Sequence, residues 1–364
     1  MTTRARVWLG AGVAGVVAVL ALLIRFGAAA LLSLTLALPA TEAWLTPLQA
    51  EPLREEIAIV SAGRRISADL YRPPHPRAAL VVVHGLSRAG RRHPEIVRLA
   101  RLLSQRGQMV VVPQVPGLVE FALTGTEIED LGAVLRDVAA RGYPAGIAGF
   151  SFGAGPALLA AADVPDVRVA GSFGGYADLI NVIGYITTGV HTFQGHRYRQ
   201  RQEEYNRWKL LALLSGLVPG ETDRRTLGAI ATRRLANPAD DTRELEARLD
   251  EPGRGVLRLA LNRDEAAVAT LVAALSPETR AMLTRLSPQS VVPRLGGRLL
   301  IAHGEADDSI PFTESLRLGE AAGGRARVVI LHTFHHTGPQ PVWTSLARRV
   351  GDGWNLMRLV DGLL

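Results

Sequence analysis

Gly146-Ile-Ala-Gly-Phe-Ser-Phe-Gly-Ala-Gly155 contains an apolar strand pattern, a sharp turn at Ser151 and the start of a helix. The stretch from Gly149 to Gly153 matches the pattern G-x-S-x-G. A serine at the tip of a strained strand-to-helix turn leaves no room for side chains two positions away, and glycine stands at both. The turn also places Ser151 at a helix N-terminus, where the backbone N–H of Phe152 favours a developing oxyanion. The stretch therefore predicts a nucleophile elbow with Ser151 as the nucleophile.

Strand and helix patterns alternate on both sides of the elbow. The runs 55–60 and 66–71 are joined by Ser61-Ala-Gly-Arg64, which has the turn residues of a hairpin. Alternating β and α units imply a mostly parallel sheet with helices on both faces. We therefore predict an α/β fold with an eight-stranded, mostly parallel sheet and an N-terminal antiparallel hairpin. Besides the elbow strand and the hairpin, strands are expected at 79–83, 109–112, 167–173, 298–302 and 327–331.

The alternation breaks down in the middle of the chain, where residues 174–293 have a mixed, helix-like character. We expect this segment to be a large helical lid or cap inserted into one α/β core. The 364 residues are enough for one large α/β domain with such an insertion. The predicted organisation is a membrane anchor at 1–40, a linker at 41–54, a core formed by 55–173 and 294–364, and the lid at 174–293.

The N-terminal anchor is predicted from Val7 to Ile24, a run of 18 residues without a charge. Such a helix is about 27 Å long, close to the ~30 Å hydrocarbon core of a bilayer. Arg4 and Arg6 precede it. Because positive charges next to a span tend to stay in the cytoplasm, they favour a cytoplasmic N-terminus and an extracytoplasmic domain. The next apolar run, 26–38, is short for a second span and could lie along the interface; if it does span, the domain is cytoplasmic. A cleaved signal peptide is the alternative to an uncleaved anchor.

The composition argues against several classes of protein. The net charge of +7 comes from arginines spread along the whole chain, with Lys209 as the single lysine, and a nucleic-acid site would cluster them on one face. With no cysteine there are no disulfides and no thiol nucleophile. His93, His191 and His196 have no ligand-like spacing, so no metal site is predicted. We expect neither a nucleic-acid partner nor a metal or organic cofactor.

A serine nucleophile needs a base to take its proton and a third group to orient that base. The acid candidates, Asp307 and Asp308, follow the predicted strand at 298–302. The histidine candidates, His335 and His336, follow the last predicted strand. All of these side chains would lie beyond the carboxyl ends of parallel strands, where ligands bind in such sheets.

These residues resemble those of the α/β-hydrolase superfamily, including its serine esterases and dienelactone-hydrolase-like members. The resemblance covers residues 55–173 and 294–364 and rests on three motifs: the strand followed by His84-Gly85, the elbow, and Gly304-x-x-Asp307-x-x-Ile310-Pro311. It implies Asp307 rather than Asp308 as the acid and His336 rather than His335 as the base. It also implies that the backbone N–H of Leu86 is the second oxyanion donor, beside that of Phe152.

The expected function is hydrolysis of a carboxylic ester, or less readily an amide, through an acyl-enzyme. The small-molecule ester is the expected partner, together with the membrane that holds the N-terminal helix. A peptidase or a lactone hydrolase with the same triad is an alternative within the enzymes. A catalytically inactive, membrane-tethered binding module is the alternative outside them.

Overall fold

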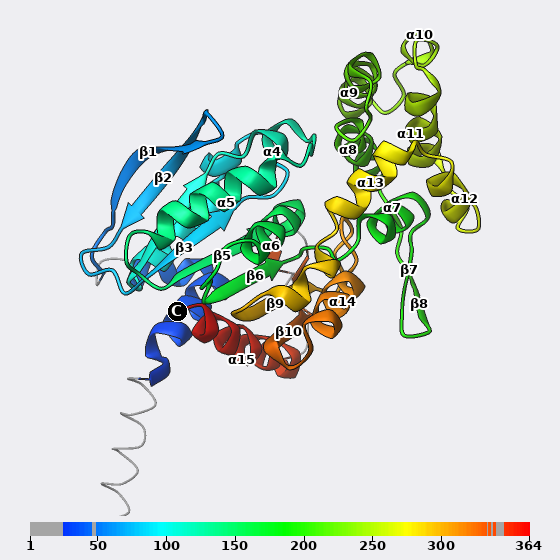
Figure 1. The fold of residues 1–364 in the computed structure, drawn as a ribbon. Helices are drawn as coiled ribbons and strands as arrows, with labels where there is room; N and C mark the ends of the chain where they lie inside the picture. Colours follow the sequence, from blue (N-terminus) through cyan, green and yellow to red (C-terminus); the bar gives the residue numbers. More distant parts are fainter. Residues whose placement is uncertain (1–24, 46–48, 333, 336–337, 340–345) are drawn as a thin grey trace, which may run out of the picture.

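The structure of this chain is a computed structural model, and its central feature is an eight-stranded sheet (Figure 1). It describes residues 25–45, 49–332, 334–335, 338–339 and 346–364, with only the backbone at 45, 334–335, 338–339 and 346–350. The strands lie in the order β1-β2-β4-β3-β5-β6-β9-β10. Their bounds are β1 Leu53–Ser61, β2 Arg64–Arg72, β3 Ala78–Val83, β4 Gln108–Pro113, β5 Ala145–Phe150, β6 Val169–Phe173, β9 Arg298–Gly304 and β10 Ala326–Leu331.

The pairing of these strands confirms the predicted mostly parallel sheet. The pairs β1–β2 and β2–β4 are antiparallel, and all other pairs in the sheet are parallel. At the predicted hairpin turn, Ala62 and Gly63 have φ values of 46° and 78°, the left-handed conformation that a tight two-residue hairpin requires. Strands β3 and β4 are buried along their whole length because helices cover both faces of a parallel sheet.

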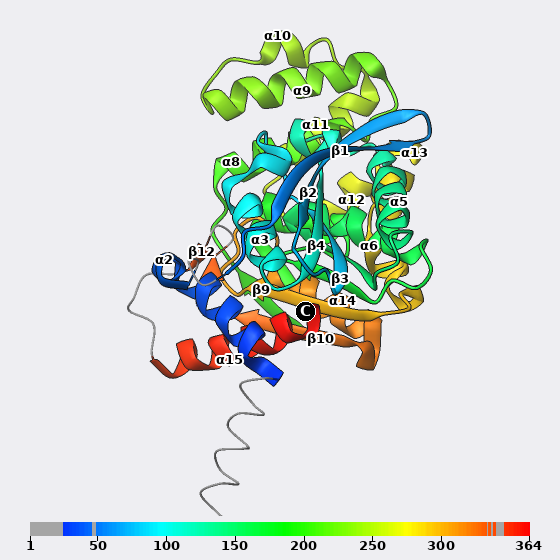
Figure 2. The same cartoon turned by 90° about the vertical axis from the view of Figure 1, so that its left-hand side faces the viewer.

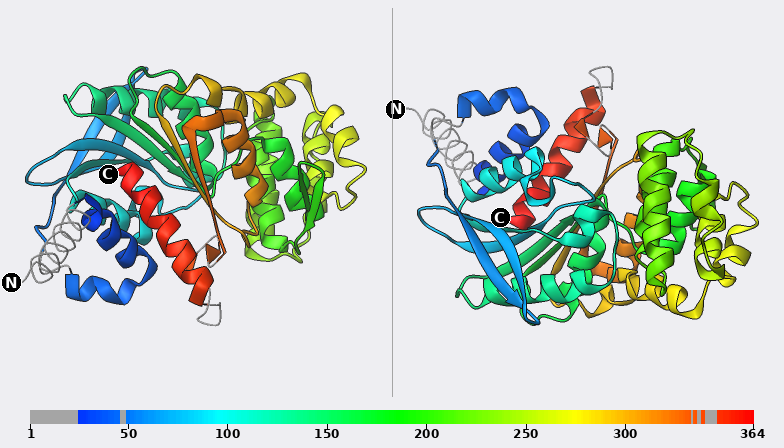
Figure 3. Two further views of the ribbon diagram at one scale, coloured as in Figure 1. Left: turned by 90° about the horizontal axis from the view of Figure 1, so that it is seen from below. Right: turned by 90° about the horizontal axis from the view of Figure 1, so that it is seen from above.

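Helices cover the two faces of the sheet and create two separate apolar cores. One core lies under α5, α6 and α14, and the other lies under α3, α15 and a helix at residues 25–37 (Figures 1 and 3). The short helix α4, Pro116–Glu120, follows β4. The long helices are α3 Pro94–Ser104, α5 Thr126–Ala139, α6 Ala154–Ala162, α14 Phe312–Ala322 and α15 Leu346–Leu363.

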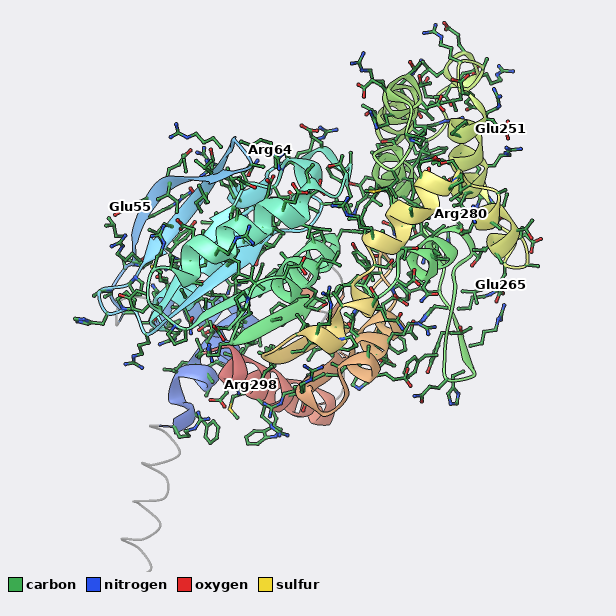
Figure 4. The ribbon with its side chains drawn as sticks, in the orientation of Figure 1. Glu55, Arg64, Glu251, Glu265, Arg280 and Arg298 are labelled. Carbon is green, nitrogen blue, oxygen red and sulfur yellow. The ribbon has the colours of Figure 1, made fainter. Side chains whose placement is uncertain are left out.

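The chain between β6 and β9 forms a mostly helical cap at one end of the molecule (Figure 2). A two-stranded hairpin, β7 Val190–Phe193 with β8 His196–Arg199, projects from it, and the sequence patterns did not reveal this hairpin. The labelled side chains of Glu251, Glu265 and Arg280 lie on the outside of the cap (Figure 4). The cap helices are α7 Leu179–Thr188, α8 Glu204–Ser215, α9 Glu221–Ala236, α10 Arg243–Glu246, α11 Glu251–Leu261, α12 Val268–Ala273 and α13 Pro277–Arg285.

The helix at residues 25–37 packs on the core with one face. Ala29 and Leu32 are 2% and 1% exposed and pack in the same apolar core as α3 and α15. The chain continues into η1, Pro39–Thr41, and α2, Glu42–Leu45, where the carboxylate of Glu42 pairs with Arg98 of α3. The predicted segment 26–38 and the start of the predicted linker therefore contact the α/β core directly.

The predicted membrane span, Val7–Ile24, lies outside the described residues. Within the part of the chain that the structure does describe, no helix combines the length and apolarity needed to cross a bilayer.

Candidate functional site

The elbow at Ser151 has the strand, turn and helix that its sequence pattern predicts. Strand β5 ends at Phe150, the turn η4 covers Ser151–Gly153, and α6 follows. Ser151 has φ = 50°, a left-handed conformation that costs a non-glycine residue roughly 1–3 kcal/mol. A Cβ on Gly149 would lie 2.4 Å from the Cα of Ala154, which explains the glycine there. The turn presents a half-buried Ser151 beyond the end of the central strand.

The turn after β3 runs directly against the elbow. A Cβ on Gly153 would lie 2.1 Å from the carbonyl oxygen of His84. A Cβ on Gly85 would lie 3.0 Å from the Cβ of Ser151 and 3.2 Å from the carbonyl oxygen of Phe150. The two backbones therefore approach as closely as glycine allows. This contact brings the peptide group between Gly85 and Leu86 beside Ser151. Leu86 and Phe152, the two predicted oxyanion donors, thus lie on facing backbones.

His84 holds the Leu86 peptide in place. It is completely buried, and its Nε2 accepts a hydrogen bond from the backbone N–H of Val115 at 3.3 Å. Its Nδ1 therefore carries the proton and donates to the carbonyl oxygen of Gly85 at 2.8 Å. Burial lowers the pKa of His84, which favours this neutral ring. Because Gly85 O and Leu86 N–H belong to one peptide plane, the bond from His84 sets the direction of that N–H.

The acid candidate Asp307 lies in the loop after β9. Its side chain is 2% exposed, and its Oδ1 accepts hydrogen bonds from the backbone N–H groups of Ser309 (2.9 Å) and Ile310 (3.0 Å). Asp307 and Ser151 line the same cavity of about 450 Å³. The neighbouring Asp308 is half-buried, and its Oδ1 lies 3.3 Å from the hydroxyl of Ser309. The structure therefore brings Asp307, rather than Asp308, into the wall shared with Ser151.

The structure does not describe the side chain of either histidine candidate. His336 lies outside the described residues. His335 lies in the short strand β11, Phe334–His335, which pairs with β12, Gly338–Pro339, and only its backbone is described. An earlier histidine, His332, follows β10, and its Nδ1 lies 2.7 Å from Oε2 of Glu305.

Sequence reasoning missed two side chains that contact the loop after β9, which carries Asp307. His303, at the end of β9, is 1% exposed, and its Nε2 lies 2.9 Å from the carbonyl oxygen of Ile310 and 3.5 Å from Oδ2 of Asp307. Its Nδ1 lies 2.7 Å from the hydroxyl of Ser315. Tyr185 of the cap donates its hydroxyl proton to the carbonyl oxygen of Asp307 at 2.7 Å. The spacing of His303 four residues before Asp307 was the available signal, and the contact with Tyr185 left no local pattern.

Two hollows are relevant to the site, one at Ser151 and one at the turn of Leu86. The cavity of about 450 Å³ lies between the sheet and the helices on its α15 side, and its walls are mostly aliphatic. A second hollow of about 830 Å³ lies between the turn at Leu86 and the cap helices α8 and α9. Charged side chains, among them Arg88, Glu221 and Arg224, line this second hollow. Across the described ranges, no three histidine, aspartate or glutamate side chains gather into a possible metal site.

A buried carboxyl group joins the core to the start of the cap. Glu314 of α14 is 1% exposed, and its Oε2 accepts hydrogen bonds from the backbone N–H groups of Ala177 (3.0 Å) and Asp178 (2.8 Å). Its Oε1 accepts one from Arg317 at 3.1 Å. Asp178 caps the N-terminus of α7. Burial raises the pKa of Glu314 to about 7, although its hydrogen-bond donors and Arg317 oppose that shift.

We expect Glu314→Gln to remove a pH dependence of stability. With a folded pKa near 7 and an ordinary value of 4.5, the folded state binds one more proton than the unfolded state between these pH values. The contribution of Glu314 to the free energy of unfolding is therefore complete below pH 4.5. It is lost as the pH rises through 7, and the free energy falls by up to about 1.4 kcal/mol per pH unit. Urea unfolding at several pH values measures it. Glu320→Gln, at an exposed position on the same helix, should keep the wild-type slope, and equal slopes in all three proteins would contradict the assignment.

Comparison with known proteins identifies the fold. No family model matches the sequence, and no curated protein matches it. An acylaminoacyl peptidase in complex with Z-Gly-Gly-Phe-chloromethyl ketone is similar in structure, with a TM-score of 0.51 and 12% identity over 87% of this chain and 42% of that chain. The esterase domain of a Rhodothermus marinus protein has a TM-score of 0.47 and 17% identity over 85% of this chain and 99% of its own. The α/β hydrolase GrgF from Penicillium sp. sh18 has a TM-score of 0.49 and 13% identity over 84% and 98% of the two chains.

At these identities the likeness concerns the fold alone. The present chain spans less than half of the peptidase's length. The chain therefore has the mostly parallel eight-stranded sheet of the α/β-hydrolase fold, with a helical cap inserted between its sixth and seventh strands.

Proposed function

We propose that this protein is a serine hydrolase that cleaves a carboxylic ester through an acyl-enzyme. The observation that carries the proposal is the placement of Ser151 in a left-handed strand-to-helix turn, in one cavity wall with the buried carboxylate of Asp307. Left-handed backbone at a non-glycine residue is costly and concentrates at functional sites. The fold places both residues beyond the carboxyl ends of β5 and β9, where such sheets bind ligands.

In the proposed reaction, the Oγ of Ser151 attacks the ester carbonyl carbon while His336 takes the hydroxyl proton. The backbone N–H groups of Leu86 and Phe152 stabilise the oxyanion, and Asp307 keeps the imidazole in the correct tautomer. Collapse of the intermediate breaks the ester C–O bond, and the imidazolium returns its proton to the leaving alcohol. Water, deprotonated by the same histidine, then attacks the acyl carbon; the C–Oγ bond breaks, the imidazolium returns its proton to Ser151, and the acid is released. No metal or organic cofactor enters these steps.

A peptidase is the second candidate, since a similar solved structure is an acylaminoacyl peptidase. The same triad would then cleave an amide or, in a lactone hydrolase, a cyclic ester. An inactive binding module is the third, and it predicts that the serine has no chemical role. Comparing ester, lactone and peptide substrates separates the enzymes from one another.

We also propose that the N-terminal part of the chain attaches the domain to a membrane, with the domain on the extracytoplasmic side. The predicted span Val7–Ile24 would insert directly before the helix at 25–37. That helix exposes Leu31 and Leu34, which are 36% and 43% exposed, and the chain directly after it exposes Leu38 (49%) and Trp44 (82%). Exposed apolar and tryptophan side chains that follow one another along the chain favour a membrane interface. Surface arginines pair locally with carboxylates, as Arg254 does with Glu251, so we propose no nucleic-acid partner.

The proposed function predicts covalent labelling of Ser151 by a fluorophosphonate. Such a probe phosphonylates a serine whose hydroxyl is activated by a neighbouring base, and an ordinary serine hydroxyl is a weak nucleophile at neutral pH. Mass spectrometry of the digested protein should locate the adduct on Ser151, and prior heat denaturation should abolish it. Absence of the adduct from the native protein, or its presence only on other serines, would refute the proposal.

A further inference from the structure

The cavity that contains Ser151 extends along the sheet under three helices. It lies between the face of the sheet and the helices at 25–37, α3 and α15, which cover that face together (Figure 3). Ser151 and Asp307 both line it. Its volume of about 450 Å³ lies in the range of roughly 300–1,000 Å³ that is typical of sites for small molecules.

Away from Ser151, aliphatic side chains dominate the wall, and small residues on the sheet leave the space open. Leu36 of the N-terminal helix, Leu99 of α3 and Leu356 of α15 face the cavity. Ala148 and Ala302, from β5 and β9, form part of its floor. An apolar wall of this kind favours a chain of methylene groups and penalises an unpaired polar group.

The helix at 25–37 is a fixed part of this wall. The guanidinium of Arg98 donates to the carbonyl oxygen of Thr35 at 2.8 Å, and Arg25 forms an ion pair with Asp361 of α15. These contacts hold the helix against α3 and α15 at both of its ends. Leu32, between them, is buried and lines the cavity.

The hollow between the turn at Leu86 and the cap has the opposite polarity. It reaches the turn at Leu86 and is lined by charged side chains that include Arg88, Arg224 and Glu221. An ester bound at Ser151 has two parts that leave its carbonyl carbon in different directions. The apolar cavity suits the acyl part, and the charged hollow suits a polar alcohol part.

We propose that the cavity between the sheet, α3, α15 and the helix at 25–37 is the acyl-binding site, and that it takes a linear aliphatic acyl chain. This inference rests on the proposed esterase function and specifies its substrate class. The N-terminal helix thereby becomes a specificity element of the site, through Leu32 and Leu36, in addition to any role in attachment.

The test is a series of p-nitrophenyl esters from acetate to palmitate, hydrolysed by the full chain. Each buried methylene raises kcat/KM by up to about fourfold, so we expect a gain of at least roughly tenfold from acetate to octanoate. Leu36→Trp and Leu356→Trp, from two different helices of the wall, should each lower the ratio of octanoate to acetate activity by roughly tenfold or more because the indole occupies the cavity. Ala30→Trp, at an exposed position of the same helix, should leave the ratio unchanged.

The outcomes separate the two proposals. No hydrolysis of any ester, acetate included, together with no fluorophosphonate label, overturns the proposed function and this inference with it. An active enzyme whose kcat/KM does not rise with chain length, or whose ratio neither tryptophan variant changes, overturns the acyl assignment alone. Because soluble esters and bilayer lipids carry the same acyl chains, phosphatidylcholine vesicles form a second arm. Release of fatty acid from them identifies a lipid source, and hydrolysis of the soluble esters alone identifies a soluble one.

Discussion

Ser151→Ala should lower kcat for ester hydrolysis by roughly 10⁴- to 10⁶-fold, because it removes the only atom that forms the proposed acyl-enzyme. Any residual rate would come from the oxyanion donors and from substrate binding, which the substitution leaves in place. KM should change little, since the hydroxyl contributes mainly to the transition state. The measurement is steady-state hydrolysis of p-nitrophenyl esters by purified protein, with the label from a fluorophosphonate as a second readout.

The same substitution should leave the fold intact. Alanine accepts the left-handed φ of 50° about as poorly as serine does, so the free energy of unfolding should change by less than about 1 kcal/mol. Ser290→Ala, at an exposed position outside the site, is the matched control and should retain full activity. Wild-type hydrolysis rates in Ser151→Ala with wild-type stability would indicate a different nucleophile, and the absence of hydrolysis from both proteins would favour the inactive binding module.

Asp307→Asn should lower kcat by roughly 10³- to 10⁴-fold. The amide retains an oxygen that can accept from the backbone N–H groups of Ser309 and Ile310, which lie 2.9 Å and 3.0 Å from the Oδ1 of Asp307. It loses the negative charge that would orient the histidine and stabilise its protonated form. The predicted defect is therefore in catalysis, while the geometry of the loop persists.

Asp308→Asn is the matched control for that experiment. Its side chain is half-buried beside Ser309, and its backbone carbonyl, which the substitution does not touch, accepts from Asn206 at 3.0 Å. We expect this variant to keep at least about a third of the wild-type kcat. Both variants are to be compared by kcat on one ester and by thermal unfolding. A large loss in Asp308→Asn with an active Asp307→Asn would reverse the assignment of the acid.

Local sequence patterns were sufficient for the sheet and the elbow, for reasons that these elements share. The turn at Ala62 and Gly63 needs two left-handed residues, and the elbow needs glycine wherever another backbone passes within contact distance. Buried parallel strands such as β3 need an unbroken apolar run. Each of these requirements acts within a few residues, so the amino-acid order records it directly.

Long-range contacts were not predictable in this way. The hairpin β7–β8 is short and largely polar on one strand, so it has no strand-like run of apolar residues. His303 contacts Asp307 because the loop after β9 folds back over the strand end, and Glu314 meets Ala177 across 137 positions of sequence. Such contacts depend on where whole elements pack, which no local pattern encodes.

The N-terminal segment shows this division most clearly. Its amino-acid order alone established that residues 26–38 are apolar and helical in character, and an apolar helix can bury its side chains in lipid or in protein with similar gain. Only the tertiary structure shows which face of the helix is buried in protein. Ala29 and Leu32 are buried against a surface built from α3 and α15, while Leu34 stays exposed. That surface exists only after the sheet has brought together α3 and α15, which lie far apart in the sequence, and so does the cavity that the helix closes.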